Sequence, residues 1–81
     1  MTREEVMLRV RSHLAEELEV DKSRIEAQTR FKEDLDADSL DLYELVMELE
    51  DNYGISVSEE QAAQIKTVGD AVDFVLEHAP A

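Results

Sequence analysis

The stretch that decides the fold is DSLDLYELVMELEDNYG, residues 38–54. At ~100° per residue, one side of this segment carries a stripe of large side chains: Leu42, Leu45, Val46, Leu49 and Tyr53. Asp38 and Ser39 are residue types that begin helices, and Gly54 is the type that ends them. The segment therefore predicts an amphipathic helix of about four turns whose apolar stripe faces a core.

The N-terminal part of the chain predicts one helix followed by a long loop. Thr2, followed three residues later by an acid, has the pattern of a capping box, and apolar residues then recur on one face over residues 3–18. Residues 19–38 lack this periodicity. We expect them to form a long first loop that apolar side chains pin to the helices, with a turn of helix at residues 21–25 or 31–35.

The C-terminal part predicts two more helices. Ser58, followed three residues later by a glutamine, begins a short helical segment that ends near Ile65. Thr67 caps a last helix with one apolar face, which ends before Pro80. The expected fold class is therefore all-α: a small four-helix bundle of three main helices and one short helix, in a single domain over residues 1–81.

Composition and charge narrow the functional classes. The formal net charge is -13, and residues 33–81 hold all of this excess, with fourteen acids and one base, Lys66. Such a surface repels nucleic acid and favours basic partners. The absence of cysteine excludes a disulfide framework, a thiolate metal site and a catalytic thiol. Because we find no signal-peptide pattern and no membrane-length apolar run, we expect a cytoplasmic chain that does not insert into membranes.

A second apolar group lies on the central helix, away from the core stripe. Leu40, Tyr43 and Met47 fall roughly 100° to 160° from the centre of that stripe, beside several acids. Large apolar side chains among acids indicate a docking face for partners with a basic rim and an apolar centre. The expected docking residues are Asp38, Leu40, Asp41, Tyr43, Glu44, Met47, Glu48 and Asp51. Scattered apolar residues on a solvated acidic helix are the alternative.

Ser39 stands where the central helix begins, and a serine at such a position is most often an N-cap. The same position suits a phosphodiester, because a phosphate on the hydroxyl would meet unpaired backbone N–H groups and the positive end of the helix dipole. The two histidines, His13 and His78, belong to other predicted helices. Ser39 is therefore not an obvious hydrolase nucleophile, and we expect no catalytic residue in the chain.

The sequence LDADSLD at residues 35–41, followed by ELVM at 44–47 and LE at 49–50, resembles the attachment region of acyl carrier proteins. The resemblance continues through IKTV at 65–68 and AVDF at 71–74, and more loosely through the first helix. It implies that Ser39 covalently carries a 4'-phosphopantetheine arm, which a phosphopantetheinyl transferase adds from coenzyme A. The thiol of the arm would then hold acyl groups as thioesters.

The resemblance implies a carrier and not an enzyme. As a monomer, the chain would deliver growing fatty acyl chains to fatty acid synthesis enzymes with basic docking patches. In the family the acyl chain can retreat between the helices, here into a space expected to be lined by Val10, Leu45, Val46, Leu49, Val68 and Val72, which could equally be plain core. A carrier for polyketide or another specialised acyl pathway, and an unmodified acidic interaction module, are the alternatives.

Two positions depart from the common pattern of that family. Asp36 stands where a glycine is frequent, and it adds charge that could alter the loop geometry or the preference of the transferase. Tyr43 stands where a small aliphatic residue is usual, and it enlarges the proposed docking face. These departures leave the identity of the partners open.

A calcium-binding module is a competing hypothesis. Asp34, Asp36 and Asp38 have the spacing of the first three ligands of an EF-hand loop. The rest of the pattern fails, because Ser39 replaces the invariant glycine and Leu45 replaces the bidentate glutamate that ends the loop. We therefore expect no specific metal site, only weak binding of divalent cations caused by the charge density.

Overall fold

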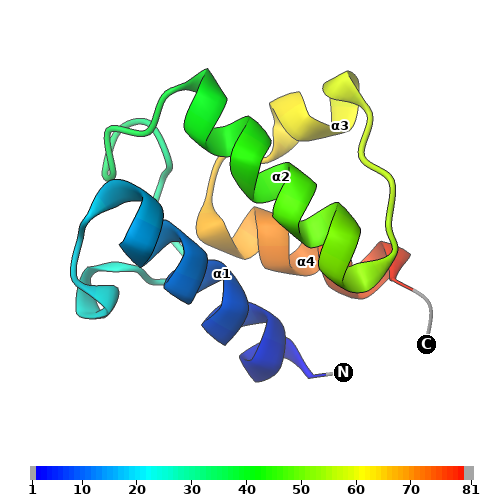
Figure 1. The fold of residues 1–81 in the computed structure, drawn as a ribbon, viewed down its shortest axis with the longest axis horizontal. Coiled ribbons are helices and arrows are strands. Elements are labelled where there is room, and N and C mark those ends of the chain that lie inside the picture. Colours follow the sequence, from blue (N-terminus) through cyan, green and yellow to red (C-terminus); the bar gives the residue numbers. More distant parts are fainter. Residues whose placement is uncertain (1, 80–81) are drawn as a thin grey trace.

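The computed structural model describes residues 2–79, which fold into α-helices joined by loops (Figure 1). The elements are α1 (Arg3–Leu18), the short 3₁₀ helix η1 (Lys22–Arg24), α2 (Ser39–Tyr53), α3 (Glu59–Gln64) and α4 (Val68–His78). The predicted all-α fold, with three main helices, one short helix and a long first loop, is confirmed. Within the described residues no helix is both long enough and apolar enough to cross a membrane. Pro80 lies outside this range.

Three helices begin at the N-cap residues that the sequence predicted. The side chains of Thr2, Ser58 and Thr67 each accept a hydrogen bond from the backbone N–H three residues later, at the starts of α1, α3 and α4. Gly54 ends α2 in the left-handed conformation, with φ 63°. These local signals therefore set where most helices start and stop.

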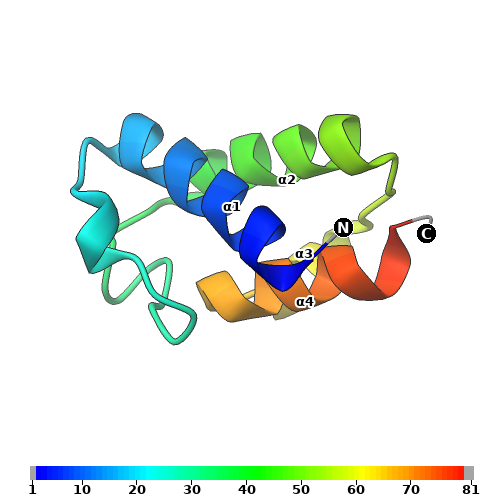
Figure 2. The ribbon, with the colours of Figure 1, turned by 90° about the horizontal axis from the view of Figure 1, so that it is seen from below.

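The core lies between α1, α2 and α4, as Figures 1 and 2 show, and α1 contacts both of the other helices. Val6, Val10 and Leu14 of α1 are at most 1% exposed, and so is Leu45 of α2. The buried side chains of α4 are Val68, Ala71, Val72 and Val75. Burying a large aliphatic side chain contributes about 1.5–3 kcal/mol, so this three-helix contact is the main source of stability.

The loop between α1 and α2 lies at the end of the bundle opposite the two chain ends (Figures 1 and 2). Three backbone hydrogen bonds fasten it to the start of α4. They are Gly69 N–H to Ala27 O (2.7 Å), Val68 N–H to Thr29 O (2.9 Å) and Phe31 N–H to Lys66 O (3.0 Å). Ile25, Phe31, Leu35 and Ala37 are the buried apolar residues of this loop, which confirms that apolar side chains pin it to the bundle.

Of the two helical turns considered for this loop, only the first is helical. Residues 22–24 form η1, whose N-cap Asp21 accepts a hydrogen bond from the N–H of Ser23. Residues 31–35 form hydrogen-bonded turns instead. There, the carbonyl oxygen of Arg30 accepts from the N–H groups of both Asp34 and Leu35, so the bonding pattern does not settle into a regular helix.

The loop and α4 approach each other closely at Gly69. A Cβ at this position would lie 2.9 Å from the carbonyl oxygen of Ala27, which is a backbone atom and cannot rotate away. Gly69→Ala should therefore lower the free energy of unfolding by about 2 kcal/mol, measured by urea denaturation. Glu77→Ala, on the exposed part of the same helix, is the control and should change it by less than about 0.5 kcal/mol. Equal stability of the two variants would contradict the tight contact.

Candidate functional site

Asp38, and not Ser39, is the N-cap of α2. The carboxylate of Asp38 accepts a hydrogen bond from the N–H of Asp41 (3.0 Å), and the carboxylate of Asp41 accepts one from the N–H of Asp38 (3.1 Å). Ser39 is the first residue of the helix. The expectation that Ser39 caps the helix is therefore wrong, because the longer Asp38 side chain completes a reciprocal pair that a serine one residue later cannot make.

Ser39 is consequently available for another role. The residue is exposed, and within residues 2–79 its hydroxyl has no hydrogen-bond partner. The Asp38 carboxylate accepts a hydrogen bond from the N–H of Asp41, and the Asp38 carbonyl oxygen accepts one from the N–H of Leu42 (3.2 Å). The N–H groups of Ser39 and Leu40, at the N-terminal end of the helix, are therefore left without a partner in the helix. These N–H groups and the helix dipole favour an anion attached to Ser39.

The turn before this helix uses Asp36 in an unusual backbone conformation. Asp36 has φ 54°, in the left-handed region that favours glycine. The next residue, Ala37, is buried, and its N–H donates to the carbonyl oxygen of Phe31 (2.9 Å). The position therefore has a geometric preference for glycine, and aspartate tolerates it better than most other residues do.

Asp36→Gly should raise the free energy of unfolding by about 0.5–1 kcal/mol, because glycine removes the left-handed strain at a smaller cost in unfolded-chain entropy. Thermal and urea unfolding measure the gain. Asp36→Asn is the matched control, since asparagine removes the charge and keeps a side chain that also tolerates this conformation. If the two variants gained equally, charge and not backbone conformation would be responsible.

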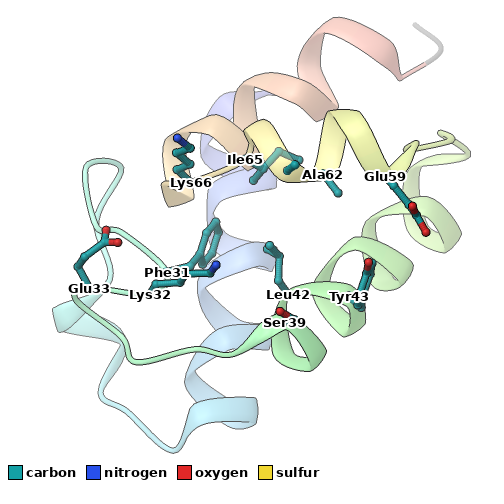
Figure 3. Close-up of a pocket in the computed structure, with 11 residues that line it drawn as sticks. Phe31, Lys32, Glu33, Ser39, Leu42, Tyr43, Glu59, Ala62, Ile65 and Lys66 are labelled. Atoms are coloured by element: carbon teal, nitrogen blue, oxygen red, sulfur yellow. The ribbon is translucent and has the colours of Figure 1, made fainter.

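A cavity of about 460 Å³ lies beside Ser39, between α2, α3 and the first loop (Figure 3). Its apolar lining comes from Phe31, Leu42, Ala62, Ala63 and Ile65. The polar residues around it are Lys32, Glu33, Ser39, Tyr43, Glu59 and Lys66. The exposed serine thus stands next to a hollow that is apolar inside and polar at its edge.

The six residues expected to line an acyl-binding space are buried in the core. Val10, Leu45, Val46, Leu49, Val68 and Val72 are at most 6% exposed, and none of them lines this cavity. They are core residues, because they face the contact between α1, α2 and α4. Sequence periodicity found only this buried stripe. Periodicity did not identify Phe31 and Ala62, which line the cavity because of how the loop runs and where α3 lies.

The second face of α2 is exposed as the sequence predicts. The exposed fractions are 65% for Leu40, 49% for Tyr43 and 60% for Met47. By contrast, Leu45 and Leu49 on the core stripe are at most 2% exposed. Three large side chains therefore face solvent along one side of the helix that begins at Ser39.

The acids of α2 do not all share that face. Asp38 and Asp51 are exposed, whereas Asp41 and Glu44 are half-buried and come within 4.8 Å of Glu17 on α1. Half-buried Glu48 borders a groove between α1 and α2, and its carboxylate accepts a hydrogen bond from Asn52 (3.0 Å). The eight predicted docking residues therefore differ in exposure, and Asp41, Glu44 and Glu48 lie toward α1.

The three aspartates with EF-hand spacing do not bring their carboxylates together in residues 2–79. Asp34 accepts two hydrogen bonds from the Arg30 side chain (3.2 Å each) and one from the Arg30 N–H (2.8 Å). The side-chain hydrogen bond from Arg30 holds the pKa of Asp34 below its ordinary value. Asp38 is committed to its cap. Two of the three aspartates are therefore engaged in hydrogen bonds within the chain.

Comparison with known proteins decides the family. Residues 8–75 match the family model described as phosphopantetheine attachment site. The chain is 47% identical over 81 residues to the acyl carrier protein of Rubrobacter xylanophilus, with both chains covered completely. The chain belongs to the acyl carrier protein family. It is also 44% identical over 78 residues to the acyl carrier protein of Lactobacillus acidophilus, covering 96% of this chain and 98% of that protein.

The fold of this acyl carrier protein agrees with a solved structure of the family. The acyl carrier protein from Enterococcus faecalis superimposes with a TM-score of 0.84 at 39% identity, covering 98% of this chain and 100% of that one. Members of the family are carriers and not enzymes, and their cofactor is covalent 4'-phosphopantetheine, so the resemblance drawn from residues 35–41 is confirmed.

Proposed function

We propose that this acyl carrier protein carries growing fatty acyl chains as thioesters on a phosphopantetheine arm attached to Ser39. The observation that carries the proposal is the position of Ser39: exposed, first in α2, and beside an apolar cavity. The segment that matches the attachment-site family includes this serine. We further propose that the chain acts as one domain, as a monomer, in the cytoplasm.

The chain supplies the acceptor for the arm, and the transferase supplies the base. The hydroxyl oxygen of Ser39 would form the bond to the phosphorus that bears the pantetheine, while the pyrophosphate bond of coenzyme A breaks and adenosine 3',5'-bisphosphate leaves. The resulting phosphodiester would lie at the unpaired N–H groups that begin α2. His13 belongs to α1 and His78 to the last turn of α4, and neither borders the cavity beside Ser39. The proton of the hydroxyl must therefore leave to a group of the partner enzyme.

The cavity gives the acyl group a place away from water. A flexible arm on Ser39 can return the thioester to the cavity that Ser39 itself borders. Phe31, Leu42 and Ile65 would then cover the apolar chain, and their burial of its methylene groups favours the retracted state. A partner enzyme has to draw the chain out before it can react.

The exposed face of α2 would meet those partners. Acids along the helix attract basic surfaces over a distance, and Leu40, Tyr43 and Met47 add apolar contact once the surfaces touch. Because the helix begins at Ser39, a partner seated on it would have the arm at its edge. The expected complexes form quickly and weaken as salt concentration rises.

The attachment site is tested by intact mass after incubation with coenzyme A and a phosphopantetheinyl transferase. We expect the native chain and Ser56→Ala, an exposed serine control, to gain the mass of one arm, and Ser39→Ala to gain none. Ser39→Ala should keep its stability within about 0.5 kcal/mol, because Asp38 caps the helix. Modification of Ser39→Ala, or no gain on the native chain, would refute the assignment.

The docking face is tested by reversing one charge. Asp51→Lys should slow association with a basic fatty acid synthesis enzyme by about tenfold at low salt, because it weakens electrostatic steering. Stopped-flow fluorescence gives the association rate. Glu77→Lys makes the same charge change on α4 and should have a much smaller effect. Equal slowing in both variants would contradict a docking face on α2 and would indicate that only net charge matters. The difference in association rate between the two variants should shrink at high salt.

A further inference from the structure

The groove between α1 and α2 is a second hollow in the surface, separate from the cavity beside Ser39. Figures 1 and 2 show the two helices side by side. The groove has a volume of about 500 Å³, and no residue of its lining also lines the cavity. Its lining on α1 runs from Glu5 to Glu16. The groove therefore extends about 16 Å along α1, the length of a helix of about three turns.

An exposed apolar side chain borders this groove. Leu8 of α1 is 57% exposed, whereas Val6 and Val10 of the same helix are fully buried. Apart from the exposed face of α2, the large apolar side chains that stand exposed in residues 2–79 are Leu8 and Leu76, and Leu76 is only 37% exposed. Packing within the chain does not cover Leu8, so an apolar contact from outside would remove its surface from water.

The charge of the groove is mostly negative. Three acids line it: Glu5 and Glu16 on α1, and Glu48 on α2. Within residues 2–79 none of the three forms an ion pair. The lining holds one arginine, Arg9, which donates a hydrogen bond to Asn52 (3.1 Å) and lies over the Tyr53 ring, 5.8 Å from its centroid. An exposed leucine among uncompensated acids favours an occupant that is both apolar and cationic.

The walls of the groove favour a helix over an extended segment. Both walls are helices, whose backbone groups away from their ends are already paired. An extended segment would find no backbone partners there, whereas a helix pairs its own N–H and C=O groups. A basic amphipathic helix would bring apolar side chains to Leu8 and cationic side chains to the acids.

We propose that this groove binds a basic amphipathic helix of a partner protein, in a contact that does not use the arm on Ser39. Ser39 and Glu48 lie about 14 Å apart along the axis of α2. The exposed face of Leu40, Tyr43 and Met47 contributes nothing to the groove lining. The contact therefore leaves the attachment site accessible, and the unmodified and modified chains should bind the helix equally. This binding is additional to acyl carriage.

The test uses a fluorescein-labelled peptide of leucine and lysine, about twelve residues long, whose leucines share one face of a helix. Fluorescence anisotropy gives its dissociation constant for the unmodified chain. Leu8→Gln should weaken binding about tenfold, because the apolar contact is lost. Leu76→Gln on α4 and Leu40→Gln on the exposed face of α2 also remove an exposed leucine. These matched controls should change the dissociation constant by less than about twofold.

A second pair of variants tests the acids. The double variant Glu16→Gln, Glu48→Gln should weaken the peptide about two- to fivefold at low salt, and less at high salt. Glu59→Gln with Glu77→Gln removes the same charge from α3 and α4 and should have a smaller effect. Melting temperatures verify that every variant folds.

Four outcomes would overturn the inference. A loss with Leu40→Gln in place of Leu8→Gln would put the peptide on the exposed face of α2. Equal binding by all variants, or equal binding of a peptide with the same residues in scrambled order, would show attraction between net charges alone. Self-association of the native chain that Leu8→Gln abolishes would assign the groove to a second copy.

The fourth outcome is binding that requires the phosphopantetheine arm, which would contradict a contact independent of Ser39. Because the peptide is measured on the unmodified chain, failure of the transferase to modify Ser39 would refute the proposed function and leave this inference standing. The two failures are thereby distinguished.

Discussion

The structure depends on the backbone hydrogen bonds that fasten the first loop to the start of α4. The carbonyl of Ala27 lies so close to Gly69 that the position has no room for a side chain. This contact sets the path of the loop, and the loop carries Phe31 into the wall of the cavity and leads to Ser39. This loop has no regular periodicity. It is nevertheless held in one position, because its carbonyl and N–H groups form hydrogen bonds with the backbone at the start of α4.

Helix α2 joins the core, the attachment point and the exposed face in a single rigid element. Its buried stripe joins the core that also contains the buried residues of α1 and α4, and the other side presents Leu40, Tyr43 and Met47 to solvent. Because both faces belong to one helix, its packing fixes how Ser39 is presented to a partner. Every charged residue of this helix is an acid.

Much of the fold could be predicted because its signals are local. Caps at Thr2, Ser58 and Thr67, and the glycine after α2, act through side chains within a few residues of the backbone groups they satisfy. The N-cap of α2 was harder to predict, because Asp38 and Ser39 are neighbours and both residue types are good caps. Only the reciprocal hydrogen bonds with Asp41 identify Asp38 as the cap. Helical periodicity identified the buried stripes but not the cavity beside Ser39, because the cavity depends on how the loop and α3 pack.

The sequence by itself determined the helices, the acidic region, the exposed apolar face of α2 and the family, since each follows from the order of residues along a short segment. Only the tertiary structure decided that Asp36 occupies a left-handed turn and that the cavity lies between α2, α3 and the loop. It also brought Lys32 and Lys66 into the lining of that cavity. These features join residues far apart in the chain, so their geometry depends on how the loop and α3 pack, which no local pattern encodes.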